Sequence, residues 1–286
     1  MPRLLAFGHV SRDRRPGGDV LGGSVTYGAL TARKLGWEAA ILTSAGPDFE
    51  PGRELPGIPA FVRRSSATTR FVNEYDADGT RRQVVTARAT DVDLEALPEA
   101  WRDPDALLLG PLVGELGGVG ATALEAGCVG AIAQGYVRSI DGEGRVSARE
   151  WARPERDLLG VHVLFLSEHD LPDADRRAAE LLAHVPMIAL TRGWRGLTLL
   201  TRQGTHEVPS LPRPEVDPTG AGDVFAAAFL VRYQETGDPL EAAAFGACAA
   251  SCAVEGVGAT TLGDRDEVRR RLALREQMIE TGDWDE

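Results

Sequence analysis

Short apolar segments alternate with longer, alanine-rich segments along most of the chain. The short ones are runs of Leu, Ile, Val and Ala bounded by polar or glycine-rich stretches, a pattern typical of buried strands. We therefore predict strands over residues 4–8, 39–44, 106–110, 131–134, 163–167, 187–191 and 196–201.

The longer segments have the spacing of helices, which we predict over 24–35, 223–234, 239–255 and 265–281. Strands that alternate with helices favour an α/β fold, in which helices flank a doubly wound, mainly parallel sheet. The chain contains no internal repeat and no low-complexity linker, so we predict a single domain over residues 1–286.

One stretch breaks this alternation. Residues 68–75 and 80–86 alternate their side chains around Asp76–Gly79, which predicts a β-hairpin. Its side chains are mostly polar, so it is not a central strand pair of the sheet. A hairpin that projects from an α/β sheet is a candidate lid, and the alternative is a solvated edge hairpin with no gating role.

Composition excludes several classes of protein. A hydrophobic fraction of 43% with 26% charged residues is that of a globular domain, and the net charge of −12 argues against a nucleic-acid partner. No apolar run is long enough to span a membrane, and the first residues pass directly into a predicted strand, so we expect a cytoplasmic protein. The cysteines fit a reducing compartment; Cys248 and Cys252 could in principle clasp a metal, but small core residues are favoured.

The most informative segment runs from Glu215 to Phe229, where a glycine turn leads into an apolar helix. Gly220 and Gly222 lack a Cβ, so backbone N–H groups there can approach a ligand closely. The first N–H groups and the dipole of the following helix favour an anion, and phosphate is the usual one. Asp223 would repel that anion unless it acts as a general base, which predicts phosphoryl transfer. The alternative is that Asp223 only caps the helix.

The same residues carry a family resemblance. Asp217-Pro-Thr-Gly-Ala-Gly-Asp223 resembles the D-x-x-G-A-G-D signature of the ribokinase-like (PfkB) carbohydrate kinases, and no Walker loop is present. The resemblance implies ATP as donor, Mg²⁺ as cofactor, Asp223 as base, and anion binding by Gly220, Ala221 and Gly222. It also implies lid elements over about 12–21 and 61–88, because the predicted hairpin lies where the family places a sheet over the sugar.

Three upstream motifs concern the acceptor. Gly8-His-Val-Ser-Arg-Asp13, Leu21-Gly-Gly-Ser24 and Ala133-Gln-Gly-Tyr-Val-Arg138 together resemble the archaeal and plant myo-inositol kinases of this superfamily. That resemblance implies that the acceptor contacts Asp13, Gly22, Gly23, Gln134 and Arg138.

Two of these acceptor residues have simpler alternatives, namely a surface loop acid for Asp13 and an ordinary ion pair for Arg138. The segment between Asp13 and Gly22 is shorter than in most ribokinases, and Ser24 and Tyr27 stand within a motif that in ribokinases contains lysine and asparagine. These departures argue against a ribokinase or fructokinase. They also weaken any prediction of a lid-mediated dimer, so the expected state is a monomer or a homodimer.

The resemblance extends to the nucleotide. It implies donor contacts from residues at the ends of later strands, from the glycine turn and from a slot for adenine over 245–252: Ser167, Asp170, Thr191, Gly193, Gly196, Thr219, Gly220, Gly222 and Cys252. It also implies a monovalent cation such as K⁺, held by Asp217, Thr219, Gly256 and Gly258.

The sequence thus predicts an ATP-dependent kinase that phosphorylates a hydroxyl of a cyclitol or sugar, with a myo-inositol-like acceptor favoured. A nucleoside or linear-sugar kinase of the same superfamily is the nearer alternative. A non-catalytic ligand-binding protein on a kinase scaffold is the more distant one.

Overall fold

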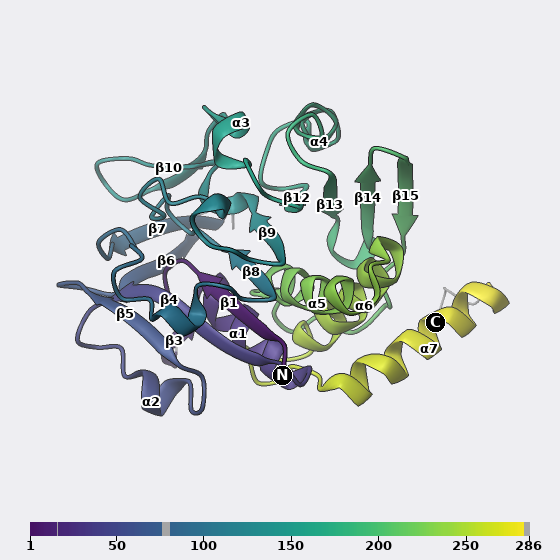
Figure 1. The fold of residues 1–286 in the computed structure, drawn as a ribbon, viewed down its shortest axis with the longest axis horizontal. Coiled ribbons are helices and arrows are strands. Elements are labelled where there is room, and N and C mark those ends of the chain that lie inside the picture. The colour runs from purple at the N-terminus through teal and green to yellow at the C-terminus, as the bar shows by residue number, and fades with distance from the viewer. Residues whose placement is uncertain (16, 76–80, 283–286) are drawn as a thin grey trace.

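The computed structural model describes residues 1–15, 17–75 and 81–282, and its main feature is a nine-stranded sheet in the order β15-β14-β13-β12-β9-β8-β1-β4-β5 (Figure 1). The strands of this sheet, in chain order, are β1 (Arg3–Phe7), β4 (Glu38–Ala45), β5 (Ala60–Arg64), β8 (Ala106–Leu109), β9 (Cys128–Ile132), β12 (Val163–Ser167), β13 (Met187–Thr191), β14 (Leu197–Thr201) and β15 (Gly204–Val208). All neighbouring strands from β5 to β13 are parallel, and β14 and β15 add an antiparallel edge. The predicted mainly parallel sheet is confirmed.

Apolar residues on both faces of the central strands explain the layered architecture. In β1, Leu4 and Ala6 belong to one buried cluster while Leu5 and Phe7 belong to the other. Because successive side chains of a strand point to opposite faces, such a strand is stable only when both faces are covered.

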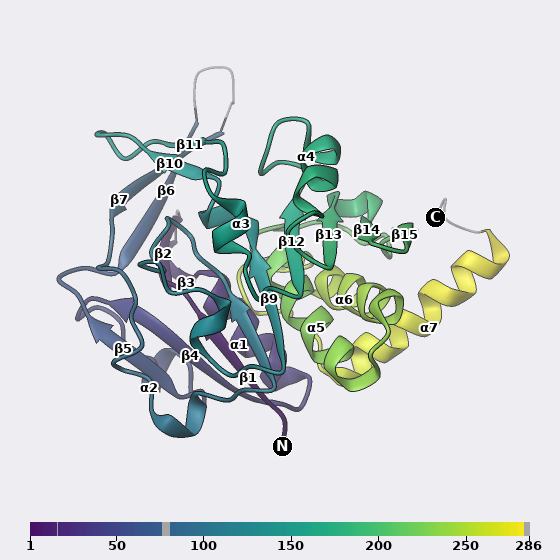
Figure 2. The same cartoon turned by 45° about the horizontal axis from the view of Figure 1, so that its top comes forward.

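Helices supply much of that cover. α1 (Ser24–Lys34), α5 (Ala221–Thr236) and α6 (Pro239–Ala253) pack on one face, and α7 (Arg265–Thr281) packs against α6 (Figures 1 and 2). The other face is covered by α4 (Ala174–Leu181) and by connecting segments. No helix within the described ranges is both long and apolar enough to cross a membrane.

A second, four-stranded sheet stands apart from the first, in the order β3-β2-β6-β7 (Figure 2). Its strands are β2 (Ser11–Arg15), β3 (Gly18–Gly22), β6 (Thr69–Tyr75) and β7 (Arg81–Ala87). The predicted hairpin is therefore present as β6 and β7, and its turn, residues 76–80, lies outside the described residues. β2 and β3 pair in antiparallel fashion and lie at the predicted 12–21 lid element, and β2 pairs with β6 in parallel.

Several elements differ from the prediction. The strand expected over 131–134 is β9, which ends at Ile132, and Ala133–Gly135 form a 3-10 turn in which Gly135 lies against the carbonyl of Pro111. β5, β15 and α4 were not predicted. β5 pairs with β4 in the large sheet, so of the expected 61–88 lid element only β6 and β7 belong to the small sheet.

The remaining α-helices and strands of the described residues are short. These are α2 (Pro51–Glu54), α3 (Pro154–Asp157) and the hairpin of β10 (Arg138–Ile140) with β11 (Val146–Ala148). The β10–β11 hairpin contacts the small sheet, because Val84 forms a bridge with Arg145 and the Val85 N–H donates to the Gly144 carbonyl. Residues of the small sheet and Arg138 thereby come to the same side of the molecule.

Candidate active site

The glycine turn opens α5 in the geometry that the sequence predicts. Gly220 is the N-cap residue with φ of 85°, a left-handed conformation, and a Cβ there would lie 2.5 Å from the ring of Tyr27. A Cβ on Gly222, by contrast, would face open space. The N–H of Ala221 donates to the Pro218 carbonyl at 3.2 Å. Within the described chain, the N–H groups of Gly222 and Asp223 have no backbone acceptor, so these two are available to an anion.

Asp223 lies in the first turn of α5 but does not cap it, since no side chain makes a capping hydrogen bond at this end. Burial raises the pKa of Asp223 to about 6. Ser24 and Arg138 act to lower that pKa, and the carboxylates of Asp13 and Asp170 act to raise it. The carboxylate is therefore poised to titrate near neutral pH, as a general base should be.

The buried hydroxyl of Ser24 lies near the carboxylate of Asp223. The hydroxyl approaches the carboxylate and lowers its pKa, but the pair does not reach full hydrogen-bonding geometry, and no described residue partners Ser24 Oγ. The side chain is 0% exposed. A buried hydroxyl without a partner is costly, so a ligand atom in this position would satisfy it.

The acceptor side is built from the β2–β3 hairpin. Asp13 Oδ1 accepts a hydrogen bond from Ser11 Oγ at 3.0 Å, and a Cβ on Gly22 would lie 2.4 Å from Asp13 Oδ2. Gly23 has φ of 96°, and a Cβ there would lie 2.5 Å from the His9 carbonyl. The glycine pair is thus required for the close approach of β3 to β2 and for the start of α1.

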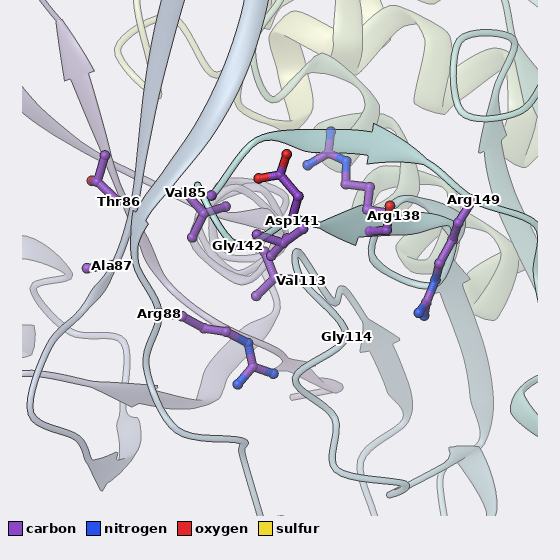
Figure 3. A pocket seen from close by; sticks show the side chains of 13 residues that line it. Val85, Thr86, Ala87, Arg88, Val113, Gly114, Arg138, Asp141, Gly142 and Arg149 are labelled. Carbon is purple, nitrogen blue, oxygen red and sulfur yellow. The ribbon is translucent and has the colours of Figure 1, made fainter.

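Arg138 begins β10 and lies near both Asp223 and Asp170. Its positive charge therefore lowers the pKa of each carboxyl. It also lines a pocket of about 620 Å³ between β7, the β10–β11 hairpin and Val113–Gly114, where Arg88 and Arg149 lie too (Figure 3). Gln134 lies in the 3-10 turn between β9 and β10. Three charged groups from distant parts of the sequence therefore lie near Asp223: Asp13, Arg138 and Asp170.

The predicted donor residues lie at the ends of neighbouring strands. Ser167 and Thr191 are in register at the ends of β12 and β13, and Asp170 Oδ2 accepts from the Ser167 N–H at 2.8 Å. Burial raises the pKa of Asp170. Gly193 and Gly196 bracket the turn into β14, both with positive φ.

Cys252 differs from these donor residues. It is 1% exposed, and Gly263 packs against its sulfur, so its side chain does not line an open slot. Cys128 and Cys248 are also free and buried, and among the described residues no three His, Cys, Asp or Glu side chains are arranged to hold a metal. These cysteines are core residues.

The two implied cations fit the site differently. Mg²⁺ in kinases is commonly held by one or two carboxylates together with substrate phosphates, and Asp170, with Ser167 beside it, offers such a carboxylate. A monovalent cation at Asp217 and Thr219 does not fit. Arg15 Nη2 lies 2.8 Å from Asp217 Oδ2 and 3.2 Å from Thr219 Oγ1, so a guanidinium already stands there.

Gly256 and Gly258 were expected to share that cation site. The Gly258 N–H points at Asp217 Oδ2 at 3.5 Å, and a Cβ on Gly256 would lie 2.4 Å from the Thr261 methyl. The Gly258 N–H thus approaches the carboxylate that was expected to bind the cation.

Sequence reasoning missed Arg15, Ser24 and Tyr27. Tyr27 is buried, and the nearby carboxylates of Asp223 and Asp13 add to burial in raising its pKa. Ser24 and Tyr27 fall in the motif after the glycine pair, and their spacing on one helix was the available signal. Arg15 had no comparable signal, because its partners lie about 200 residues away.

Part of the chain is similar to a known kinase family. Residues 153–265 match the model of the pfkB family carbohydrate kinases. A nucleoside kinase of Methanocaldococcus jannaschii is 33% identical over 118 residues, a match that covers 39% of this chain and only 39% of that protein.

Solved structures extend the likeness to nearly the whole chain. A pyrophosphate-dependent kinase of the ribokinase family, complexed with a pyrophosphate analogue and myo-inositol, has a TM-score of 0.74 at 22% identity over 93% of this chain and 99% of that one. The Arabidopsis thaliana ribokinase complexed with ribose and ATP has a TM-score of 0.73 at 22% identity over 95% and 98%. Members of the family are phosphotransferases that act on hydroxyl groups of sugars or nucleosides. Residues 153–265 are therefore similar to the pfkB family carbohydrate kinases, and the chain has a ribokinase-like fold.

Proposed function

We propose that this kinase transfers the γ-phosphoryl group of ATP to a hydroxyl of a cyclitol or sugar, with a myo-inositol-like acceptor favoured. The observation that carries the proposal is the position of Asp223. It lies one residue beyond the free N–H of Gly222, with its pKa raised to about 6 by burial, on the side where Asp13 and Arg138 converge.

The reaction follows from this arrangement. Asp223 takes the proton of the acceptor hydroxyl as the oxygen attacks the γ-phosphorus; the new O–P bond forms, the bond to the β,γ-bridging oxygen breaks, and ADP leaves. The N–H groups of Gly222 and Asp223 stabilise charge on the transferring group. Asp13 orients the acceptor by accepting hydroxyl hydrogen bonds, and Arg138 donates to it. Asp170 would hold Mg²⁺, and the ion would neutralise phosphate charge.

The remaining residues of the proposed site contact the acceptor, border the donor or belong to the lid. The glycines Gly22 and Gly23 admit the acceptor against the β2–β3 hairpin, and Gln134 contacts its ring. Thr191, Gly193 and Gly196 border the donor. The small sheet of β2, β3, β6 and β7 acts as the lid, because it carries Asp13 on the acceptor side.

A nucleoside acceptor is the second candidate, favoured by the similarity to the nucleoside kinase of M. jannaschii. A panel of myo-inositol, other cyclitols, ribose, fructose, adenosine and cytidine, each with ATP or pyrophosphate as donor, separates the candidates. Preferred phosphorylation of myo-inositol, measured as kcat/KM, supports the proposal. Preferred phosphorylation of cytidine or ribose would show that the rival acceptor is the right one. Preferred use of pyrophosphate would show that pyrophosphate, and not ATP, is the donor.

A further inference from the structure

Arg15 makes a contact that neither the family signature nor the proposed reaction requires. It ends β2, and its guanidinium bridges the carboxylate of Asp217 and the hydroxyl of Thr219. Asp13, the proposed acceptor ligand, lies two residues before it on the same strand. Thr219 directly precedes Gly220, so one side chain joins the acceptor strand of the lid to the phosphate-binding turn.

The partner carboxylate is buried and would need a countercharge in any case. Asp217 is 7% exposed; it accepts a hydrogen bond from the Thr219 N–H at 3.1 Å and forms an ion pair with Arg15. A buried carboxylate without a cation is strongly unfavourable, and an ion pair with a guanidinium relieves that cost. Burial acts to raise the pKa of Asp217, yet hydrogen bonds from Thr219 and the charge of Arg15 leave it below its ordinary value.

A guanidinium and a metal cation cannot both occupy this position. Arg15 Nη2 stands 2.8 Å from Asp217 Oδ2, and the Gly258 N–H points at the same oxygen. We infer, on the basis of the proposed kinase function, that Arg15 is a positioning residue that takes the place of a monovalent cation at Asp217 and Thr219. Phosphoryl transfer in this protein is then independent of K⁺.

The test compares the wild type with Arg15→Ala, Arg15→Lys and a matched control, Arg14→Ala. Arg14 is the neighbouring arginine, its side chain is 65% exposed, and its carboxylate neighbour is Asp19 at 4.0 Å rather than Asp217. Activity is measured in KCl, NaCl and choline chloride at constant ionic strength. For the wild type, Arg14→Ala and Arg15→Lys, the kcat of each protein should not change from one salt to another.

Arg15→Ala should behave differently. Its kcat in choline chloride should fall by about 10- to 100-fold, since one partner of a buried charge pair is gone. KCl should restore much of that loss by filling the vacated position. Activation of the wild type by K⁺ would overturn the inference, as would an Arg15→Ala variant that is fully active in choline chloride or is rescued by no monovalent cation.

Thermal melting in the same salts gives a readout that needs no catalysis. KCl should raise the melting temperature of Arg15→Ala relative to choline chloride and leave the wild type unchanged. If no acceptor is phosphorylated, the proposed function fails, while this melting comparison still decides the role of Arg15. Should Arg15→Ala not fold, the wild-type and Arg15→Lys comparison decides it.

Discussion

At the scale of single residues, Asp223 combines two properties that conflict in an ordinary surface acid. It is partly buried beside a glycine turn that we propose binds anions, and it keeps a titratable carboxyl whose pKa is raised to about 6. Burial disfavours the charged form, and Asp13 and Asp170 add to that effect. A base held in this way is ionised at neutral pH and still basic enough to accept a proton.

Replacing Asp223 by Asn should therefore lower kcat by about 10²–10⁴-fold, the range of a general base. Wild-type kcat/KM should rise with pH around a midpoint near 6, because only the ionised carboxylate accepts the proton. Asp266→Asn is a matched control, since Asp266 also lies in the first turn of a helix, α7, away from the site. Steady-state kinetics from pH 5 to pH 8 checks both expectations, and near-normal turnover of Asp223→Asn would remove Asp223 from the mechanism.

The same substitution should stabilise the fold. A carboxyl whose pKa is raised on folding adds stability at low pH, and that contribution is lost as pH rises through about 6. At pH 7 the free energy of unfolding of the Asn variant should exceed that of the wild type by about 1–3 kcal/mol. This gain should vanish below about pH 4, near the ordinary pKa of Asp. Urea denaturation at pH 4 and pH 7 measures it, and a variant less stable than the wild type at pH 7 would contradict the burial argument.

The two glycines of the turn should respond differently to substitution. Gly222→Val puts a side chain into open space, so the protein should fold normally but lose kcat by about 10²–10³-fold as the anion site is crowded. Gly220→Ala instead strains a left-handed residue against Tyr27 and should cost about 1–3 kcal/mol of stability. Melting curves with kinetics separate the two effects, and full activity of Gly222→Val would exclude the anion site.

At the scale of elements, the strong hydrophobic patterns were predicted well. The sequence ranges for β12, β13 and α7 match the observed bounds, because each is a long periodic or uniformly apolar run. The β2–β3 hairpin was not predicted as strands. Its strands are short, and their residues are mostly polar or charged. Because β2 pairs with β6 some 60 residues away, the formation of this hairpin depends on tertiary contacts.

The junction between the two sheets rests on a buried polar network. Glu115 is 0% exposed and accepts backbone N–H groups of His9, Leu112 and Val113 at 2.7–2.9 Å. Burial lowers the pKa of His9, so the ring is neutral; its Nε2–H donates to the Thr90 carbonyl, and its Nδ1 accepts from the Thr69 hydroxyl. Thr69 begins β6, so this network fastens the small sheet to the end of β1.

Glu115→Gln should destabilise the protein by about 1–3 kcal/mol, because an amide nitrogen replaces one acceptor oxygen and leaves a buried N–H unsatisfied. Glu143→Gln provides the control, since Glu143 is exposed on the β10–β11 hairpin. Urea denaturation of both variants makes the comparison. Equal stability of Glu115→Gln and the wild type would show that the network does not hold the junction.

At the scale of the whole molecule, the site is assembled from four distant parts of the chain. Asp223 and the glycine turn were found from sequence because they form one contiguous motif. Arg15 and the unpartnered Ser24 were not, because their importance arises only when the lid hairpin and α1 meet α5. The expected K⁺ site shows the same limit. Asp217 and Thr219 form one motif in the sequence, but Arg15, about 200 residues earlier, pairs with the Asp217 carboxylate and donates to the Thr219 hydroxyl.

The most direct test of the central claim is transfer of labelled phosphate from [γ-³²P]ATP to myo-inositol by the wild type and by Asp223→Asn. The account predicts a labelled inositol phosphate with the wild type and a rate about 10²–10⁴-fold lower with Asp223→Asn. No labelled product with any cyclitol, sugar or nucleoside, or equal rates for the two proteins, would contradict it.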